Sequence, residues 1–306
     1  MQFGAHLPTY WTDYGTSNMR VAIEEAAKAA EALGYTAIWA NDSVMVPAGF
    51  SFQGHVTDKF QVIEPLITLA SLVHLVPRIK LGTHVLVLPQ RNAIIVAKQV
   101  AALDLLSESR LILGVGVGWR AEEFKLLNAD FEHRGALADE SIEVMRTLWR
   151  EPVASFHGQF YDFSDALFLP KPVGGSLPIW VGGLTAPAIR RAARVGDAWI
   201  PWGPGLDEFK AGVASLRELT QGRRCPMLAA TVNLRIDNPG KPAGPTKSDQ
   251  IPITCAGSPD AIAHYLDQYR QAGLEYTLCG FNAESVDDLL RQMRIFAEQI
   301  APQFAE

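Results

Sequence analysis

The sequence predicts an α/β fold, a (β/α)₈ TIM barrel, and three observations lead to this prediction. Eight short apolar runs alternate with eight longer segments of helical periodicity, a pattern typical of βαβ units and a parallel sheet. The length of 306 residues suits one barrel of roughly 250 residues or more. Some runs, such as 111–113, are apolar on both faces, as expected for strands covered on both sides. An open doubly wound sheet is the competing architecture.

The individual elements follow from apolar runs of strand length and from apolar residues spaced three and four apart. The predicted strands lie at residues 2–8, 36–42, 79–88, 111–118, 177–183, 197–202, 227–236 and 276–281. The predicted helices lie at residues 18–33, 64–76, 92–107, 135–150, 185–195, 207–220, 259–272 and 285–300. Local signals support the register of the seventh helix: Ser258 is a good N-cap, Pro259 suits the first helical position, and Gly273 follows the last turn.

Two segments interrupt the alternation within what we predict to be a single domain spanning residues 1–306. Residues 151–177 contain Phe160 and Tyr161, and we predict a hairpin insertion there. Residues 237–252, after the seventh strand, are rich in proline and glycine. This composition predicts a long mobile loop, and loops of this length often act as lids.

Composition excludes several classes of protein. Hydrophobic residues make up 48% of the chain and charged residues 20%, so a large core is expected and intrinsic disorder is not. The net charge of -6 argues against nucleic acid or an anionic membrane as a partner of the whole surface. The cysteine count of 3 is odd, and the N-terminus has no basic region before an apolar block, so we expect a cytoplasmic protein.

Polar residues and glycines concentrate where the predicted strands end. His6, Asp42, Ser43, Thr83 and His84 all occupy such positions. Each of them alone is explained by capping or by a backbone hydrogen bond. Because the C-terminal strand ends of a barrel converge at one mouth, their joint placement predicts a site there.

Three glycines, Gly114, Gly116 and Gly118, alternate along the fourth strand. Their GxGxG spacing is a poor match to the GxGxxG dinucleotide motif. Residues two apart face the same side of a strand, so the bare backbone either lets a flat group approach or allows tight packing inside the barrel. The sequence leaves both interpretations open.

A phosphate site is predicted where the fifth strand meets the next helix. Gly182 and Gly183 precede Leu184 and Thr185, and Thr185 is a candidate helix cap. Free amides and the helix dipole favour an anion at such a turn, although an ordinary βα turn has a similar sequence. Trp119 and Trp202 lie just past strand ends and are candidate walls of an apolar pocket.

The sequence shows no sign of metal or covalent catalysis. Its 7 histidines have no H-x-x-x-H or H-x-H spacing, and it has neither a nucleophile elbow nor a Walker motif. A site of glycines, tryptophans and one phosphate cradle favours a cofactor that performs the chemistry itself. A Schiff-base lyase is the less favoured alternative, because the only strand lysine, Lys80, lies early in its strand.

Four stretches of the sequence resemble the bacterial-luciferase-like superfamily of flavin and deazaflavin oxidoreductases. They are residues 79–92, 110–119, 178–183 and 192–199. The resemblance implies a (β/α)₈ barrel that binds FMN or the deazaflavin coenzyme F420 at its mouth. It further implies a bulge in the third strand with a cis peptide at His84–Val85 supporting the ring, fourth-strand glycines beside the ring, and the phosphate at Gly182, Gly183 and Thr185.

Two positions depart from the deazaflavin-dependent sugar-phosphate dehydrogenases of that superfamily. Asp42-Ser43 stands where those enzymes have an Asp-His pair, and Trp119 stands where they have an acidic catalytic residue. The resemblance therefore disfavours a sugar phosphate as the substrate. The pattern is closer to the subgroup presumed to use F420.

We therefore predict an oxidoreductase that transfers a hydride between F420 and a small organic molecule. An FMN-dependent monooxygenase and a cofactor-binding protein without turnover are the alternatives. The predicted catalytic residues are His6, Asp42 and His84, and Trp119 and Trp202 wall the substrate pocket. Predicted cofactor ligands are Asp42, Ser43, Thr83, His84, Val85, Gly116, Val117, Gly118, Gly182, Gly183, Leu184 and Thr185. The resemblance also makes a homodimer an expected assembly.

Overall fold

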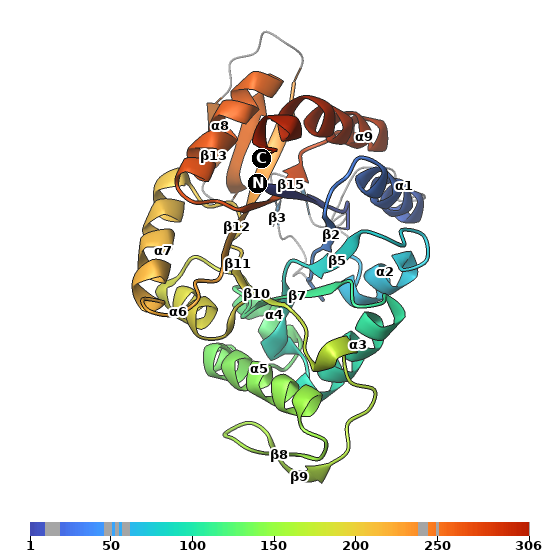
Figure 1. The fold of residues 1–306 in the computed structure, drawn as a ribbon, viewed down its shortest axis with the longest axis vertical. Coiled ribbons are helices and arrows are strands. Elements are labelled where there is room, and N and C mark those ends of the chain that lie inside the picture. Colours follow the sequence, from blue (N-terminus) through green and yellow to red (C-terminus); the bar gives the residue numbers. More distant parts are fainter. Residues whose placement is uncertain are drawn as a thin grey trace.

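A computed structural model describes residues 1–9, 19–45, 51–52, 55–56, 62–237, 244–248 and 251–305. Its centre is a closed ring of parallel strands (Figure 1). In ring order the strands are β1 (Gln2–His6), β2 (Ala37–Ala40), β5 (Lys80–Thr83), β7 (Leu111–Gly116), β10 (Ile179–Val181), β11 (Ala198–Trp199), β12 (Met227–Ile236) and β15 (Tyr276–Phe281). Pairing of β11 with β12 closes the ring. The predicted barrel and its strand order are therefore confirmed.

Helices surround the ring and follow its strands in alternation, as predicted (Figure 1). They are α1 (Met19–Ala32), α2 (Pro65–Leu72), α3 (Ala93–Leu106), α5 (Arg134–Arg150), α6 (Ala186–Val195), α7 (Leu206–Leu219), α8 (Pro259–Gln271) and α9 (Val286–Ile295). Ser258 caps α8 by accepting a hydrogen bond from the Ala261 amide at 3.4 Å. A short helix that the sequence did not predict, α4 (Ala121–Leu126), follows β7. None of the described helices is long and apolar enough to cross a membrane.

The two interrupting segments contain β-structure. In the first, β8 (Ala154–His157) and β9 (Asp162–Ala166) pair antiparallel, and Glu140 of α5 accepts hydrogen bonds from three amides of the connecting turn. In the second, β13 (Gly244–Ser248) pairs antiparallel with β14 (Ile251–Gly257). The described part of 237–252 is thus largely strand rather than loop, because β14 extends the sheet beside β12. Residues 238–243 and 249–250 lie outside the described residues, and the mobility of this segment stays a prediction.

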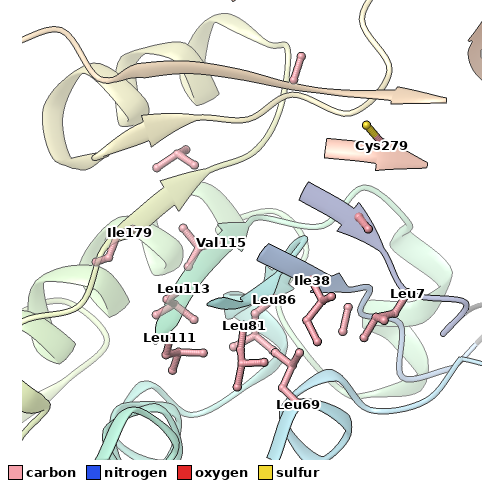
Figure 2. Close-up of a cluster of buried hydrophobic side chains, with 14 of the residues drawn as sticks. Leu7, Ile38, Leu69, Leu81, Leu86, Leu111, Leu113, Val115, Ile179 and Cys279 are labelled. Carbon is pink, nitrogen blue, oxygen red and sulfur yellow. The ribbon is translucent and has the colours of Figure 1, made fainter. Parts of the chain in front are cut away.

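Apolar side chains pack on both sides of the ring. On the outer side, residues such as Leu81, Leu113 and Val115 face the helices (Figure 2). Inside, the rings of Trp39 and Trp180 have centroids 4.9 Å apart, and the Trp39 indole donates a hydrogen bond to the Tyr276 hydroxyl at 2.9 Å. This aromatic cluster fills the interior below the mouth, so a ligand has to bind above it.

Candidate functional site

The C-terminal ends of the parallel strands form the mouth of the barrel. His6 ends β1, Thr83 ends β5, Gly116 ends β7 and Gly182 directly follows β10. The structure thus brings these predicted site residues to one end of the molecule. This convergence follows from the parallel topology, which directs every strand end the same way.

A chain of hydrogen bonds crosses the interior just below the mouth. His6 Nε2 lies 3.2 Å from His84 Nδ1, and His84 Nε2 lies 3.1 Å from Thr231 Oγ1. All three side chains are buried. Because a neutral imidazole has one donor and one acceptor nitrogen, His84 can satisfy both neighbours without a charge.

Burial keeps both imidazoles neutral. It lowers the pKa of His84 to about 4. Burial, together with the neighbouring His84, holds the pKa of His6 well below its usual value of 6.5. Neither histidine therefore has the ordinary imidazole pKa, because desolvation disfavours the charged form.

Acid is expected to destabilise the protein through this histidine pair. The unfolded chain binds a proton at each imidazole below pH 6.5, whereas folded His84 stays neutral down to about pH 4, so stability falls as the pH drops between these values. For His84 alone the loss reaches about 3 kcal/mol, at about 1.4 kcal/mol per pH unit. Urea unfolding across this range should show a shallower pH dependence for His84→Gln. The matched control is His74→Gln, at an exposed position, which should not change the slope. An unchanged slope in His84→Gln would refute the assignment.

A bulge in the third barrel strand presents Val85 at the mouth. Gly82 pairs with Ile112, and Leu86 of β6 (Leu86–Val87) pairs with Val115. Three residues, 83–85, therefore oppose the two residues 113–114, which defines a β-bulge. The His84–Val85 peptide bond within it is cis, as the resemblance implied.

The glycines of the neighbouring strands make room for this bulge. A Cβ atom on Gly116 would lie 2.5 Å from Val85 Cγ2, and one on Gly182 would lie 2.9 Å from Val85 Cγ1. A Cβ on Gly114 would collide with the Thr83 carbonyl oxygen. The Thr83 hydroxyl also donates a hydrogen bond to the Gly114 carbonyl at 2.7 Å. The structure shows close packing at these glycines, and the approach of a flat group stays a prediction.

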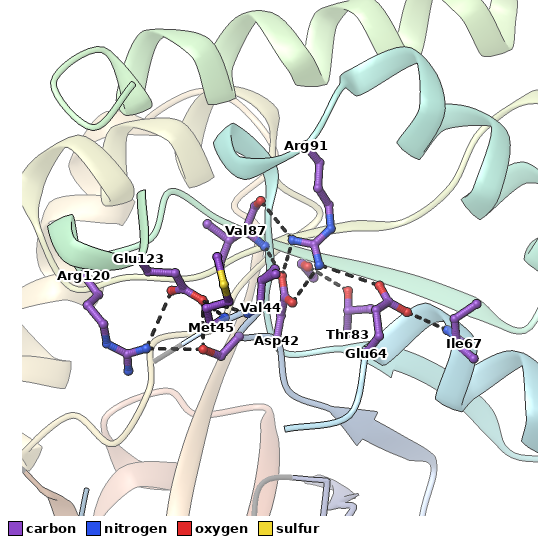
Figure 3. Close-up of polar contacts among 12 residues, drawn as sticks. Asp42, Val44, Met45, Glu64, Ile67, Thr83, Val87, Arg91, Arg120 and Glu123 are labelled. Atoms are coloured by element: carbon purple, nitrogen blue, oxygen red, sulfur yellow. Dashed lines mark hydrogen bonds and ion pairs between the residues drawn. The ribbon is translucent and has the colours of Figure 1, made fainter. Parts of the chain in front are cut away.

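Asp42 is bound within the protein. Its carboxylate receives hydrogen bonds from Arg91 at 2.7 and 2.8 Å and from the Val87 amide at 2.9 Å (Figure 3). Its side chain is 1% exposed, and burial raises its pKa against the charge of Arg91. The geometry does not support the predicted roles in catalysis and cofactor binding, because both oxygens are engaged. It makes Asp42 a positioning residue that ties β2 to β6.

Ser43 belongs to a second group of hydrogen bonds at the same end of the barrel. One oxygen of Glu123, on α4, accepts hydrogen bonds from the Ser43 hydroxyl at 2.9 Å and from the Val44 amide at 2.7 Å. Arg120 lies 3.7 Å from the other Glu123 oxygen and donates to Ser43 at 3.3 Å (Figure 3). Sequence reasoning missed Glu123 and Arg120, because contacts across about eighty positions leave no spacing signal.

The predicted phosphate turn is open to solvent. Residues 183–187 are exposed, and Gly183 has a φ of 108°, which favours glycine. The Gly183 carbonyl accepts a hydrogen bond from the Trp199 indole at 2.8 Å, which fixes the turn to the barrel. Thr185 occupies the N-cap position of α6, but its side chain makes no capping hydrogen bond. Thr185 is therefore at the predicted cap position, but the capping hydrogen bond expected from its side chain is not formed.

The predicted tryptophans follow the ends of β7 and β11. Trp119 is 64% exposed, with the Arg120 guanidinium 4.7 Å from its ring centroid. Trp202 is half-buried and pairs with Thr231 of β12. Gly118, which directly precedes Trp119, has a φ of 75° that suits the turn after β7. Among the described residues, no group of three His, Cys, Asp or Glu side chains is placed to hold a metal ion.

Sequence comparison finds relatives over most of the chain. Residues 1–236 match the family model described as luciferase-like monooxygenase. The uncharacterized protein Rv0940c of Mycobacterium tuberculosis is 31% identical over 284 residues, which cover 90% of this chain and 92% of that protein. The FMNH(2)-dependent dimethylsulfone monooxygenase of Pseudomonas putida is 32% identical over 125 residues, or 40% of this chain and 34% of that protein.

Solved structures with the same fold cover the whole chain. The monooxygenase RslO1 from Streptomyces bottropensis has a TM-score of 0.81 at 18% identity, covering 100% of both chains. An F420-dependent secondary alcohol dehydrogenase has a TM-score of 0.80 at 17% identity, covering 100% of this chain and 99% of the other. At these identities the structures support the fold alone. Since the family model matches residues 1–236 of the 306, the chain belongs to the luciferase-like monooxygenase family of oxidoreductases.

Proposed function

We propose that this protein transfers a hydride between coenzyme F420 and a small organic molecule bound at the mouth of the barrel. The observation that supports this most is the placement of Val85. Its side chain is half-buried and backed by two positions where a Cβ would intrude on it, Gly116 and Gly182. A rigidly backed apolar side chain above a filled interior suits the face of a flat ring.

The residues present fit such a cofactor at both of its ends. The ring would rest on Val85, and the exposed turn at residues 183–185 offers backbone amides and a helix N-terminus to the phosphate. The Gly182 amide is not among them, because it donates to the Val115 carbonyl at 2.9 Å. The protein carries a net charge of -6, so attraction for an anionic cofactor has to be local. The cofactor, when bound, supplies the hydride chemistry.

The chain itself contributes binding, orientation and exclusion of water. The neutral pair of His6 and His84 keeps the layer beneath Val85 uncharged. It can form a hydrogen bond to a ligand but is not protonated, so it has no extra proton to donate. The ties from Asp42 to Arg91 and from Ser43 to Glu123 hold the rim in place. Trp119 and Trp202 would form the apolar walls on either side of the substrate.

An FMN-dependent monooxygenase is the second candidate. The identity of 32% to an FMNH(2)-dependent dimethylsulfone monooxygenase favours it, although that match spans only 125 residues. FMN has the same two features, a flat ring and a phosphate, so Val85 and the Gly182–Thr185 turn would bind it in the same way.

Turnover assays separate these candidates. With reduced F420 under anaerobic conditions, we expect the purified protein to oxidise the cofactor when a ketone, enone or imine acceptor is added. A monooxygenase would instead consume oxygen with reduced FMN. Tight cofactor binding without turnover in either assay would identify a binding protein and refute the hydride-transfer proposal.

A further inference from the structure

The inner face of β12 carries a buried side chain that none of the contacts above accounts for. Ala229 lies in the interior cluster with Trp39, and Thr231 reaches His84. Asn233, two residues further along the same strand, faces the same side. Strand β12 lies across the ring from β5, which leads into the bulge (Figure 1). Asn233 lies in the C-terminal half of β12, toward the mouth.

The surroundings of Asn233 hold its carboxamide inside the barrel. It is paired with Gly280 of β15, and a Cβ on Gly280 would lie 2.6 Å from Asn233 Oδ1. The side chain is 3% exposed, and within the described part of the chain Asn233 Nδ2 has no hydrogen-bond partner. Burying an amide without a partner destabilises a fold, so native proteins seldom do so without a functional reason.

A neighbouring asparagine provides the contrast. Asn282 directly follows β15, and its Nδ2 donates to the Thr254 hydroxyl at 3.0 Å. The same type of side chain at the same end of the barrel is therefore satisfied within the protein. Asn233 Nδ2, in contrast, keeps a donor that the described residues do not use.

We propose that Asn233 is the polar anchor of the substrate site and that its Nδ2 donates a hydrogen bond to a carbonyl-type oxygen of the bound molecule. The inference rests on the proposed function in placing a ligand at the mouth. Trp202 pairs with Thr231 on the same strand, so one neutral donor lies beside an apolar wall. That combination suits an uncharged ketone, ester or amide. A ring carbonyl of the cofactor offers the same chemistry and is the other possible source of the oxygen.

The test uses the full-length protein without cofactor and two probes of similar shape, cyclohexanone and methylenecyclohexane. Ligand-detected NMR should show that the wild type binds the ketone about tenfold more tightly, as expected for one buried hydrogen bond. The variant Asn233→Leu should lose this preference and melt at a higher temperature, because it removes an unsatisfied amide. Asn233→Ala provides the same comparison if leucine does not fit. The matched control Asn282→Ala should keep the preference and melt at a lower temperature.

A second arm identifies the source of the oxygen. If the wild type shows no preference for the ketone but Asn233→Leu binds F420 or FMN about tenfold more weakly, the anchored oxygen is on the cofactor. The inference is overturned if neither preference nor cofactor affinity changes, or if Asn233→Leu and Asn233→Ala both melt at a lower temperature as Asn282→Ala does. Failure of the wild type to bind either cofactor would count against the proposed function and would leave the ketone measurement intact.

Discussion

Replacing Arg91 with leucine is expected to lower the free energy of unfolding by about 3–5 kcal/mol, the range for breaking a buried ion pair on one side. The carboxylate of Asp42 is 1% exposed and would lose both of its contacts to the guanidinium. A buried charge would then remain without a partner, held only by the Val87 amide. Urea denaturation of the variant measures the loss.

Two further variants show whether the uncompensated charge is the cause. The substitution Asp42→Asn keeps an acceptor for the Val87 amide but removes the charge. The double variant Arg91→Leu/Asp42→Asn should therefore recover a large part of the stability. Arg235 forms an exposed ion pair with Glu284: the Arg235 side chain is 41% exposed and the Glu284 side chain 74%. Arg235→Leu should therefore change stability by about 1 kcal/mol or less. A similarly small effect in Arg91→Leu would contradict a structural role for Asp42.

Adding a methyl group at Gly116 is expected to destabilise the protein by about 1–3 kcal/mol through overpacking. The new Cβ would lie 2.5 Å from Val85 Cγ2, so the bulge has to move. Shortening that neighbour in the double variant Gly116→Ala/Val85→Ala removes the collision and should restore most of the loss. Thermal or urea unfolding of the four proteins in this cycle measures the coupling.

A second glycine serves as the control for this cycle. Gly135 lies in the first turn of α5, and a Cβ there would meet its nearest neighbour, Arg191, at 3.7 Å. Gly135→Ala should therefore be neutral or slightly stabilising, since alanine favours the helix. Equal destabilisation at positions 116 and 135 would show that the cost at Gly116 is unrelated to Val85.

The barrel could be predicted from the sequence because its signals are local. Each strand is an apolar run and each helix has apolar residues on one face, so the eight repeats were identifiable without any long-range information. α4 was missed because Ala121–Leu126 is too short for a helical period to register. β13 and β14 were missed because prolines and glycines suggested a loop, whereas pairing along β12 makes this region a sheet edge.

The sequence predicted where the site residues lie better than it predicted what their side chains do. Strand ends located the mouth, and hence His6, His84, Gly116 and Gly182. The partners of Asp42 and Ser43 are 49 and 80 residues away, and no local spacing encodes such contacts. The neutrality of the histidines depends on burial, which a residue type near a strand end does not reveal. Asn233 escaped notice because its lack of a partner is visible only in three dimensions.

The central claim is that a flat, phosphate-bearing cofactor rests on Val85 at the mouth. Equilibrium fluorescence titration with F420 and with FMN, on the wild type and on the two Gly116→Ala proteins, tests it most directly. We predict that the wild type binds one cofactor at micromolar concentration or below. Gly116→Ala should bind it at least about tenfold more weakly, and the double variant should stay weak after its stability is restored, because the side chain beneath the ring is shortened. Binding of neither cofactor by the wild type, or equal affinity in all three proteins, would contradict the claim.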